Sequence, residues 1–118
     1  MDELQQARCI PCEGGVAPAN AAEIAGYLSQ ISGWQVAEVD GVKRLTKIFA
    51  LRNFVCALAF TNQVGALAEQ EGHHPALLTE WGKVTVTWWT HSIGGLHKND
   101  FVMAYKTDEA FQQASGAR

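Results

Sequence analysis

Charge is scarce in this sequence, and basic charge in particular. Asp, Glu, Lys and Arg make up 18% of the 118 residues, and nine basic residues against twelve acidic ones leave a net charge of -3. No run of lysine or arginine occurs. Because proteins that grip nucleic-acid backbones carry such basic patches, we expect no direct binding to nucleic acid.

Long apolar runs are missing as well. Asn, Arg, Thr or Gly interrupts the apolar stretches before they reach the roughly 20 residues that cross a bilayer, so we expect no membrane contact. The N-terminal stretch MDELQQARC is polar and unlike a secretion signal. We therefore expect a cytoplasmic protein whose three cysteines stay reduced.

Residues 1–19 predict an irregular leader, because they hold two prolines and a Gly-Gly pair. Within the leader, Cys9 and Cys12 form a C-x-x-C pair. A zinc site would need two more ligands, and a redox pair would stand between a strand and a helix, so metal or redox use is only the alternative to a dispensable leader. The remaining residues, 20–118, suit a single domain.

Three segments have the apolar spacing of helices. The first is predicted at about 21–31, where Asn20 and Glu23 have the spacing of a capping box. The second should begin after Asn53 and end at Gly72. Its apolar stripe is predicted to comprise Phe54, Ala57, Leu58, Thr61, Val64, Gly65 and Ala68.

The third helix is predicted to start at Asn99 or Asp100 and to end near Gln113. Cys56 falls inside the second helix and is interpreted as a small core residue. Asp40-Gly41 is a strong signal for a tight hairpin turn. Four segments are typical of strands, namely 34–38, 42–49, 77–81 and 84–90.

The order of elements is helix, hairpin, helix, hairpin, helix. This order predicts an α+β two-layer sandwich, in which three helices pack on one face of a four-stranded antiparallel sheet and the other face stays open. Along the last strand, Val84, Val86 and Trp88 should face the helices. The alternate residues should lie on the open face, namely Thr85, Thr87, Trp89 and His91.

A lone chain with that parity would leave the whole Trp89 indole in water. Burying a large side chain contributes about 1.5–3 kcal/mol, so the sequence predicts a homo-oligomer, a dimer or a tetramer, with Trp89 at or near the contact. The alternative is that residues 1–19 fold back over the same face.

Three of the four histidines lie at strand ends. His73 and His74 stand where the second helix leads into the third strand, and His91 ends the fourth. Since the start of one hairpin strand lies beside the end of the next, the three imidazoles should meet at one end of the sheet. Glu69, one helical turn before His73, can face the same place, and the third helix can bring Asp100 there.

Such a cluster indicates acid–base chemistry. Imidazoles titrate near neutrality, so one can act as a neutral base and another as a charged acid, which suits a dehydration. The alternatives are a purely structural role and a metal site, although H-x-x-x-H and H-x-H spacings are absent. His97 is interpreted as structural or surface. Trp81 is the tryptophan expected at the site, because it lies on the same hairpin.

At these positions the sequence resembles the pterin-4a-carbinolamine dehydratase family, and most of all its bacterial members that act beside phenylalanine hydroxylase. The resemblance covers about residues 20–113. It departs from the family at Leu77, where an aromatic residue is frequent, and at Asn99, where a basic one is. The residues that carry it are Glu69, His73, His74, Pro75, Trp81, Thr90, His91 and Asp100.

This resemblance implies the same sandwich fold and the dehydration of 4a-hydroxytetrahydropterin to quinonoid dihydropterin, which recycles the pterin of an aromatic amino acid hydroxylase. It implies that His73 and His91 are the acid and the base, in either order, and that His74 is a third catalytic histidine in contact with the pterin. It implies a substrate-binding role for Glu69, Pro75, Trp81, Thr90 and Asp100.

The resemblance implies neither a metal nor a bound cofactor, because the pterin is the substrate. Phenylalanine hydroxylase is the functional partner that it suggests. The alternative function is that of a protein-binding module of the coactivator type, since animal members of the family also bind a transcription factor. That role would use the helical face of the fold rather than the histidines.

Overall fold

The computed structural model describes residues 17–117. The Cys9/Cys12 pair and most of the predicted leader lie outside the described residues. The elements are α2 (Ala21–Leu28), β1 (Gln35–Val39), β2 (Val42–Ala50), α3 (Phe54–Glu71), β3 (Ala76–Glu80), β4 (Lys83–Trp88), the short 3-10 helix η1 (His91–Ile93) and α4 (Lys98–Gln112).

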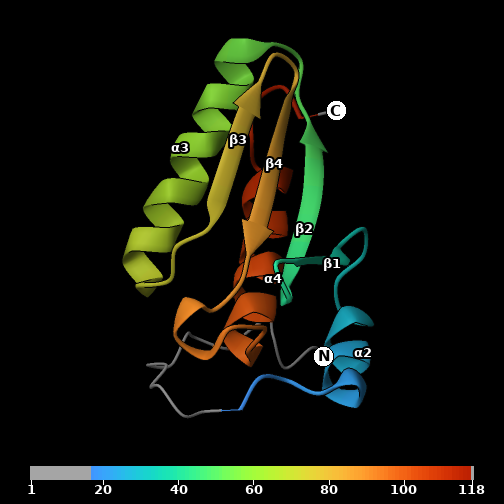
Figure 1. Cartoon of the computed structure of the whole chain (residues 1–118). Helices are drawn as coiled ribbons and strands as arrows, with labels where there is room; N and C mark the ends of the chain where they lie inside the picture. Colours follow the sequence, from blue (N-terminus) through green and yellow to red (C-terminus); the bar gives the residue numbers. More distant parts are fainter. Residues whose placement is uncertain (1–16, 118) are drawn as a thin grey trace.

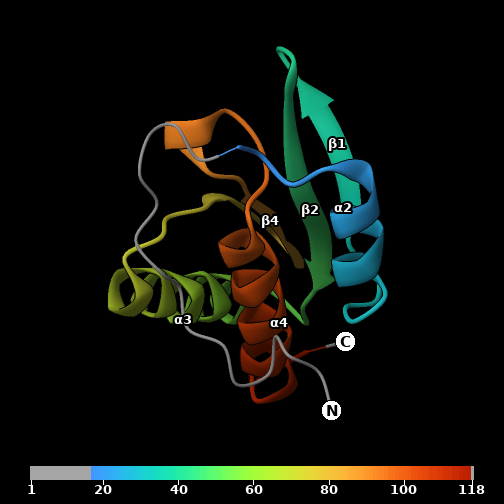
Figure 2. The same ribbon diagram turned by 90° about the horizontal axis from the view of Figure 1, so that it is seen from below.

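The strands form one four-stranded antiparallel sheet in the order β1-β2-β4-β3 (Figure 1). Helices α3 and α4 lie against one face of this sheet, and α2 packs beside α4 (Figure 2), where the rings of Tyr27 and Phe101 are 5.0 Å apart. The predicted α+β class, with helices covering a single sheet, is therefore confirmed.

Most element boundaries lie within one residue of the predicted ones, but α2 ends at Leu28, three residues before the predicted end. The Asn20 side chain accepts a hydrogen bond from the Glu23 amide at 2.9 Å, and the Glu23 carboxylate accepts one from the Asn20 amide, so the predicted capping box is present. At the first hairpin, Asp40 and Gly41 both take positive φ, at 54° and 78°, as a tight turn between twisted strands requires.

The second hairpin turns one residue earlier than predicted. Glu80 pairs with Lys83, so the turn residues are Trp81 and Gly82, with Gly82 at φ 79°. The strand β4 also ends at Trp88 instead of residue 90, because Thr90 pairs with Gly95 in a loop of its own.

The predicted parity of β4 is confirmed. Val84, Val86 and Trp88 are fully buried, and Leu45 and Phe49 of the neighbouring β2 join them under the helices. These side chains form the centre of the core, and Cys56 is buried at its edge as predicted.

The predicted apolar stripe of α3 is wrong in part. Ala57, Val64 and Ala68 are buried, but Phe54 and Leu58 are exposed. Phe60 is buried in their place, where its ring lies 5.1 Å from that of Phe49 and 5.4 Å from that of Phe111. Apolar residues surround most of this helix, so periodicity alone could not select the face that meets the sheet.

The helix α4 begins at Lys98, one residue before the predicted start. His97 is the N-cap: its Nδ1 accepts the Asn99 amide at 3.0 Å, and the Asp100 side chain accepts the His97 amide at 2.9 Å. His97 therefore has the structural role predicted for it, and the cap fixes the position of Asp100 at the same time.

Candidate active site

One end of the sandwich collects the chain segments that carry the predicted site. Figure 1 shows the end of α3, the start of β3, the end of β4, η1 and the start of α4 together at the lower end of the molecule. The β3–β4 turn lies at the opposite end. The fold thus brings these segments to one end of the sheet, while the meeting of the three imidazoles stays a prediction, because no contact among residues 17–117 joins His91 to His73 or His74.

His73 is placed by the way α3 ends. Gly72 takes the left-handed conformation at φ 67°, and its amide and the His73 amide donate to the carbonyls of Glu69 and Ala68, at 3.3 Å and 3.1 Å. These two hydrogen bonds form a Schellman motif, which ends many helices at a glycine. It turns the chain sharply, and Pro75 then keeps it out of the helical conformation before β3.

Asp100 is the centre of the site. Its carboxylate is fully buried, and it has three partners at hydrogen-bond distance. His73 Nε2 lies 2.6 Å from Oδ1, and the Thr90 hydroxyl and the His97 amide donate to Oδ2 at 2.8 Å and 2.9 Å. Because these contacts enclose the carboxylate, Asp100 is placed to orient His73 and Thr90.

The His73 ring is held on a second side by Trp88. The two rings are nearly parallel, at 8°, with centroids 5.8 Å apart, and the Trp88 indole donates to the Thr107 hydroxyl at 3.2 Å. Only 12% of the His73 side chain is exposed. Since an ionised carboxylate only accepts, Nε2 carries the hydrogen, and Nδ1 is the ring nitrogen left to meet a ligand.

His74 and Glu69 form a separate, exposed pair. The His74 Nε2 bonds to Glu69 Oε2, so this imidazole is bound to a different carboxylate from that of His73. Both side chains are open to solvent, and His74 directly follows the buried His73 in the chain. They are placed to contact a ligand from the outer side.

Thr90 and His91 belong to a short closed loop. The Thr90 amide donates to the Gly95 carbonyl at 2.9 Å and the Gly95 amide returns a bond at 3.4 Å. Between them η1 begins at His91, whose exposed ring packs against the Trp89 indole. The Thr90 side chain thus binds Asp100, whereas the next side chain, that of His91, contacts Trp89.

Of the eight predicted site residues, Trp81 is the one that the chain holds far from the histidines. It stands at the β3–β4 turn and is 69% exposed. A strand rises about 3.3 Å per residue, so β3 separates this turn from Pro75 by roughly 16 Å. Trp81 shares the β3–β4 hairpin with the histidine segments, as predicted, but it lies at the opposite end of that hairpin.

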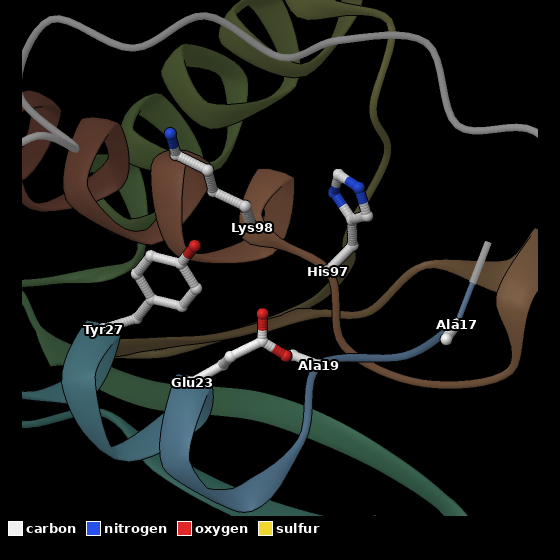
Figure 3. Close-up of a pocket in the computed structure, with 6 residues that line it drawn as sticks. All are labelled: Ala17, Ala19, Glu23, Tyr27, His97 and Lys98. Atoms are coloured by element: carbon white, nitrogen blue, oxygen red, sulfur yellow. The ribbon is translucent and has the colours of Figure 1, made fainter.

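A hollow of about 190 Å³ lies behind the start of α4 (Figure 3). Glu23 and Tyr27 of α2 line it together with His97 and Lys98 of α4. One of its residues, His97, contacts the predicted site, because the His97 amide donates to Asp100. The candidate active site lies at the end of the sheet where Asp100 connects His73 and Thr90, the residue before His91.

Residues 17–117 hold neither a metal-binding cluster nor a membrane-spanning helix. In that part of the chain no group of three or more His, Cys, Asp or Glu side chains is arranged to hold a metal ion. None of the helices described there is both long and apolar enough to span a bilayer.

Comparison with known proteins identifies the family. Residues 17–110 match the family model described as pterin 4 alpha carbinolamine dehydratase. The chain belongs to this family. It is a pterin-4a-carbinolamine dehydratase by that membership, a hydro-lyase of pterin recycling, and the pterin is its substrate.

Similar proteins cover nearly all of the chain. A candidate pterin-4-alpha-carbinolamine dehydratase of Microcystis aeruginosa is 54% identical over 113 residues, which are 96% of this chain and 97% of the relative. One of Syntrophotalea carbinolica is 57% identical over 108 residues, 92% and 96% of the two chains. The family resemblance seen in the sequence is thereby confirmed.

Solved structures share the fold. A structure described as a transcriptional coactivator/pterin dehydratase from Brucella melitensis has a TM-score of 0.71 and 32% identity, covering 79% of this chain and 97% of that one. A pterin dehydratase-like RuBisCO assembly factor of the alpha-carboxysome has a TM-score of 0.56 at 22% identity and covers 66% and 88% of the two chains. The second likeness concerns the fold alone.

The sequence pattern missed one side chain beside the site, Arg44. Its guanidinium carbon lies 4.1 Å from the centre of the Trp89 ring. The signal was available in principle, since the β2–β4 register that pairs Leu45 with Trp88 makes Arg44 the neighbour of Trp89 on the open face. That register requires knowledge of which strands are adjacent.

Proposed function

We propose that this dehydratase uses His73 as the general base and His91 as the general acid on 4a-hydroxytetrahydropterin. His73 takes the proton from N5 of the pterin, and His91 gives a proton to the hydroxyl that leaves C4a. The bond between C4a and oxygen breaks, the N5 electron pair forms the new double bond, and the products are quinonoid dihydropterin and water.

The observation that carries this assignment is the 2.6 Å contact between His73 Nε2 and Asp100 Oδ1. A buried carboxylate fixes the tautomer of its histidine partner and stabilises the imidazolium that forms when the ring accepts a proton. His73 is therefore equipped to act as a base through Nδ1. His91 has no carboxylate partner among residues 17–117, so the supported base is His73 and the role of the acid is assigned to His91.

The other predicted residues then act around this pair. His74 and Glu69 are exposed and paired with each other, which suits binding of the polar pterin ring from outside. Pro75 holds the histidine pair in an extended chain, and Thr90 contacts the carboxylate beside His91. Asp100 is assigned the positioning of His73 instead of direct contact with the pterin, because it is fully buried.

The proposal extends to the setting of the enzyme. The resemblance to bacterial members that serve phenylalanine hydroxylase supports a cytoplasmic role in recycling the pterin of that enzyme, and a homo-oligomeric state. The decisive experiment is an assay of the purified protein on freshly generated 4a-hydroxytetrahydropterin, which follows the appearance of quinonoid dihydropterin. No acceleration over the spontaneous reaction would contradict the proposal.

A second candidate function is protein binding through α3. Phe54, Val55 and Leu58 are large apolar residues that this helix exposes, with Val55 74% accessible. Such an exposed patch is typical of an interaction surface. A pulldown with the dimerisation segment of a transcription factor separates the two functions: Val55→Asp should abolish capture but not dehydration, and His73→Ala the reverse.

A further inference from the structure

Three side chains form a cluster on the open face of the sheet, next to the site. The Trp89 ring contacts both of the others: the Arg44 guanidinium carbon is 4.1 Å from its centre, and the His91 ring is 4.6 Å away between centroids. The two rings are inclined at 46°. Arg44 comes from β2, so this cluster connects His91 to a strand that otherwise carries no site residue.

Arg44 is held in an unusual way. Its Nε atom is shielded from water and has no hydrogen-bond partner among the described residues. A buried N–H group without an acceptor destabilises a protein, and such groups are rare in native structures. The contact that compensates here is the attraction between the guanidinium charge and the indole face.

His91 has no other support of the kind that His73 has. His73 is fixed by a carboxylate at 2.6 Å and by a parallel indole. Within residues 17–117 the His91 side chain has one contact, with the Trp89 ring. A general acid must be oriented toward its leaving group, and small errors in that orientation cost much of its rate.

We propose that Trp89 and Arg44 are positioning residues for His91. The guanidinium holds the indole, and the indole sets the orientation of the imidazole that protonates the leaving hydroxyl. This inference rests on the acid role proposed for His91. Neither Trp89 nor Arg44 needs to contact the pterin for it.

Steady-state kinetics of four variants provide the first test. Trp89→Leu should lower kcat about 3- to 10-fold with KM nearly unchanged, and Trp89→Phe should restore most of the rate, because a smaller ring still packs on His91. Arg44→Gln should lower kcat roughly 2- to 5-fold, and Arg44→Lys should recover part of it, since a cation remains over the ring. Lys43→Gln, an exposed charge change next to Arg44 on β2, is the matched control and should keep the wild-type kcat.

The second test is a double-mutant cycle with His91→Ala. If Trp89 and Arg44 act through His91, adding Trp89→Leu or Arg44→Gln to His91→Ala should change kcat less than 2-fold further. An equal loss in both backgrounds would overturn the inference, as would a rise in KM at constant kcat, which would make Trp89 a wall of the binding site.

The two proposals fail differently. Full activity of His91→Ala would contradict the acid role itself, whereas a slow His91→Ala with a fully active Trp89→Leu would contradict only the positioning role. Thermal melting of each variant identifies any that do not fold. If Trp89→Leu does not fold, the double-mutant cycle with Arg44→Gln, which keeps the indole, tests the positioning role.

Discussion

His73 Nε2 lies 2.6 Å from Asp100 Oδ1, although 27 residues separate the two in the chain. The end of α3 supplies the imidazole and the N-cap region of α4 supplies the carboxylate. The same carboxylate closes the capping box of α4 and accepts the Thr90 hydroxyl. A local device that starts a helix thus also orients the proposed base.

Asp100→Asn should lower kcat by roughly 10²-fold or more. The amide can still cap the helix through its oxygen, but its NH2 group then faces His73, and the charge that stabilises the imidazolium is lost. Asp108→Asn is the matched control, because Asp108 lies on the same helix and binds Lys47 and Trp34 away from the site. Equal activity of Asp100→Asn and wild type would remove His73 from the role of base.

His73→Ala and His91→Ala should each reduce the dehydration rate by about 10²–10⁴-fold, as expected for a lost general base or acid. Folding should change little, which circular dichroism and thermal melting would check. His97→Asn, which keeps an N-cap residue outside the proposed pair, should remain active. Were both alanine variants to keep full activity, the acid–base assignment would be wrong.

Chelation should leave the rate unchanged, because proton transfer between two imidazoles and the pterin is sufficient for the reaction. The measurement is the rate before and after treatment with EDTA, together with elemental analysis of the protein. A stoichiometric metal whose removal abolishes activity would contradict this prediction and favour a site on His73, His74 and His91.

Gly72→Ala should destabilise the protein by about 1 kcal/mol in urea unfolding. A Cβ at Gly72 meets no atom within 4 Å, so the cost arises from the left-handed conformation at φ 67°. Gly65→Ala, in the middle of α3 and equally free of contacts, should instead stabilise it by roughly 0.5–1 kcal/mol. Because His73 follows Gly72 directly, the activity of Gly72→Ala should fall as well, and an unchanged stability would show that this turn is not fixed.

The protein should sediment as a homo-oligomer, at least a dimer, at micromolar concentration. Trp89 favours an oligomer less than its sequence position predicts, because Arg44 and His91 already cover part of the indole within one chain. The open face still exposes Ile48 by 63% and Leu78 by 58%, on either side of Thr85 in the strand register. These two residues now support the prediction.

Ile48→Glu should therefore weaken assembly, whereas Gln63→Glu, at an exposed polar position of α3, serves as the control. A clean 12.8 kDa monomer, unchanged when residues 1–19 are deleted, would contradict the oligomer. A monomer that assembles only after this deletion would favour the leader as the cover of the open face.

The sequence by itself determined the α+β sandwich and the order of its elements, since period-2 and helical spacings, caps and turn residues are local signals that act within a few positions. It also predicted which face of β4 is buried, because strand parity follows from neighbouring residues. Even the meeting of His73 and His91 segments at one end followed from hairpin geometry alone.

Only the tertiary structure decided what depends on packing between distant elements. The face of α3 that meets the sheet includes Phe60 and leaves out Phe54, because the partner surface selects among apolar residues that surround the helix. Trp81 lies at the far end of the hairpin, since a strand's length separates its two ends. Arg44 reaches Trp89 because β2 and β4 are adjacent, and adjacency of strands is set by the whole sheet and not by either segment.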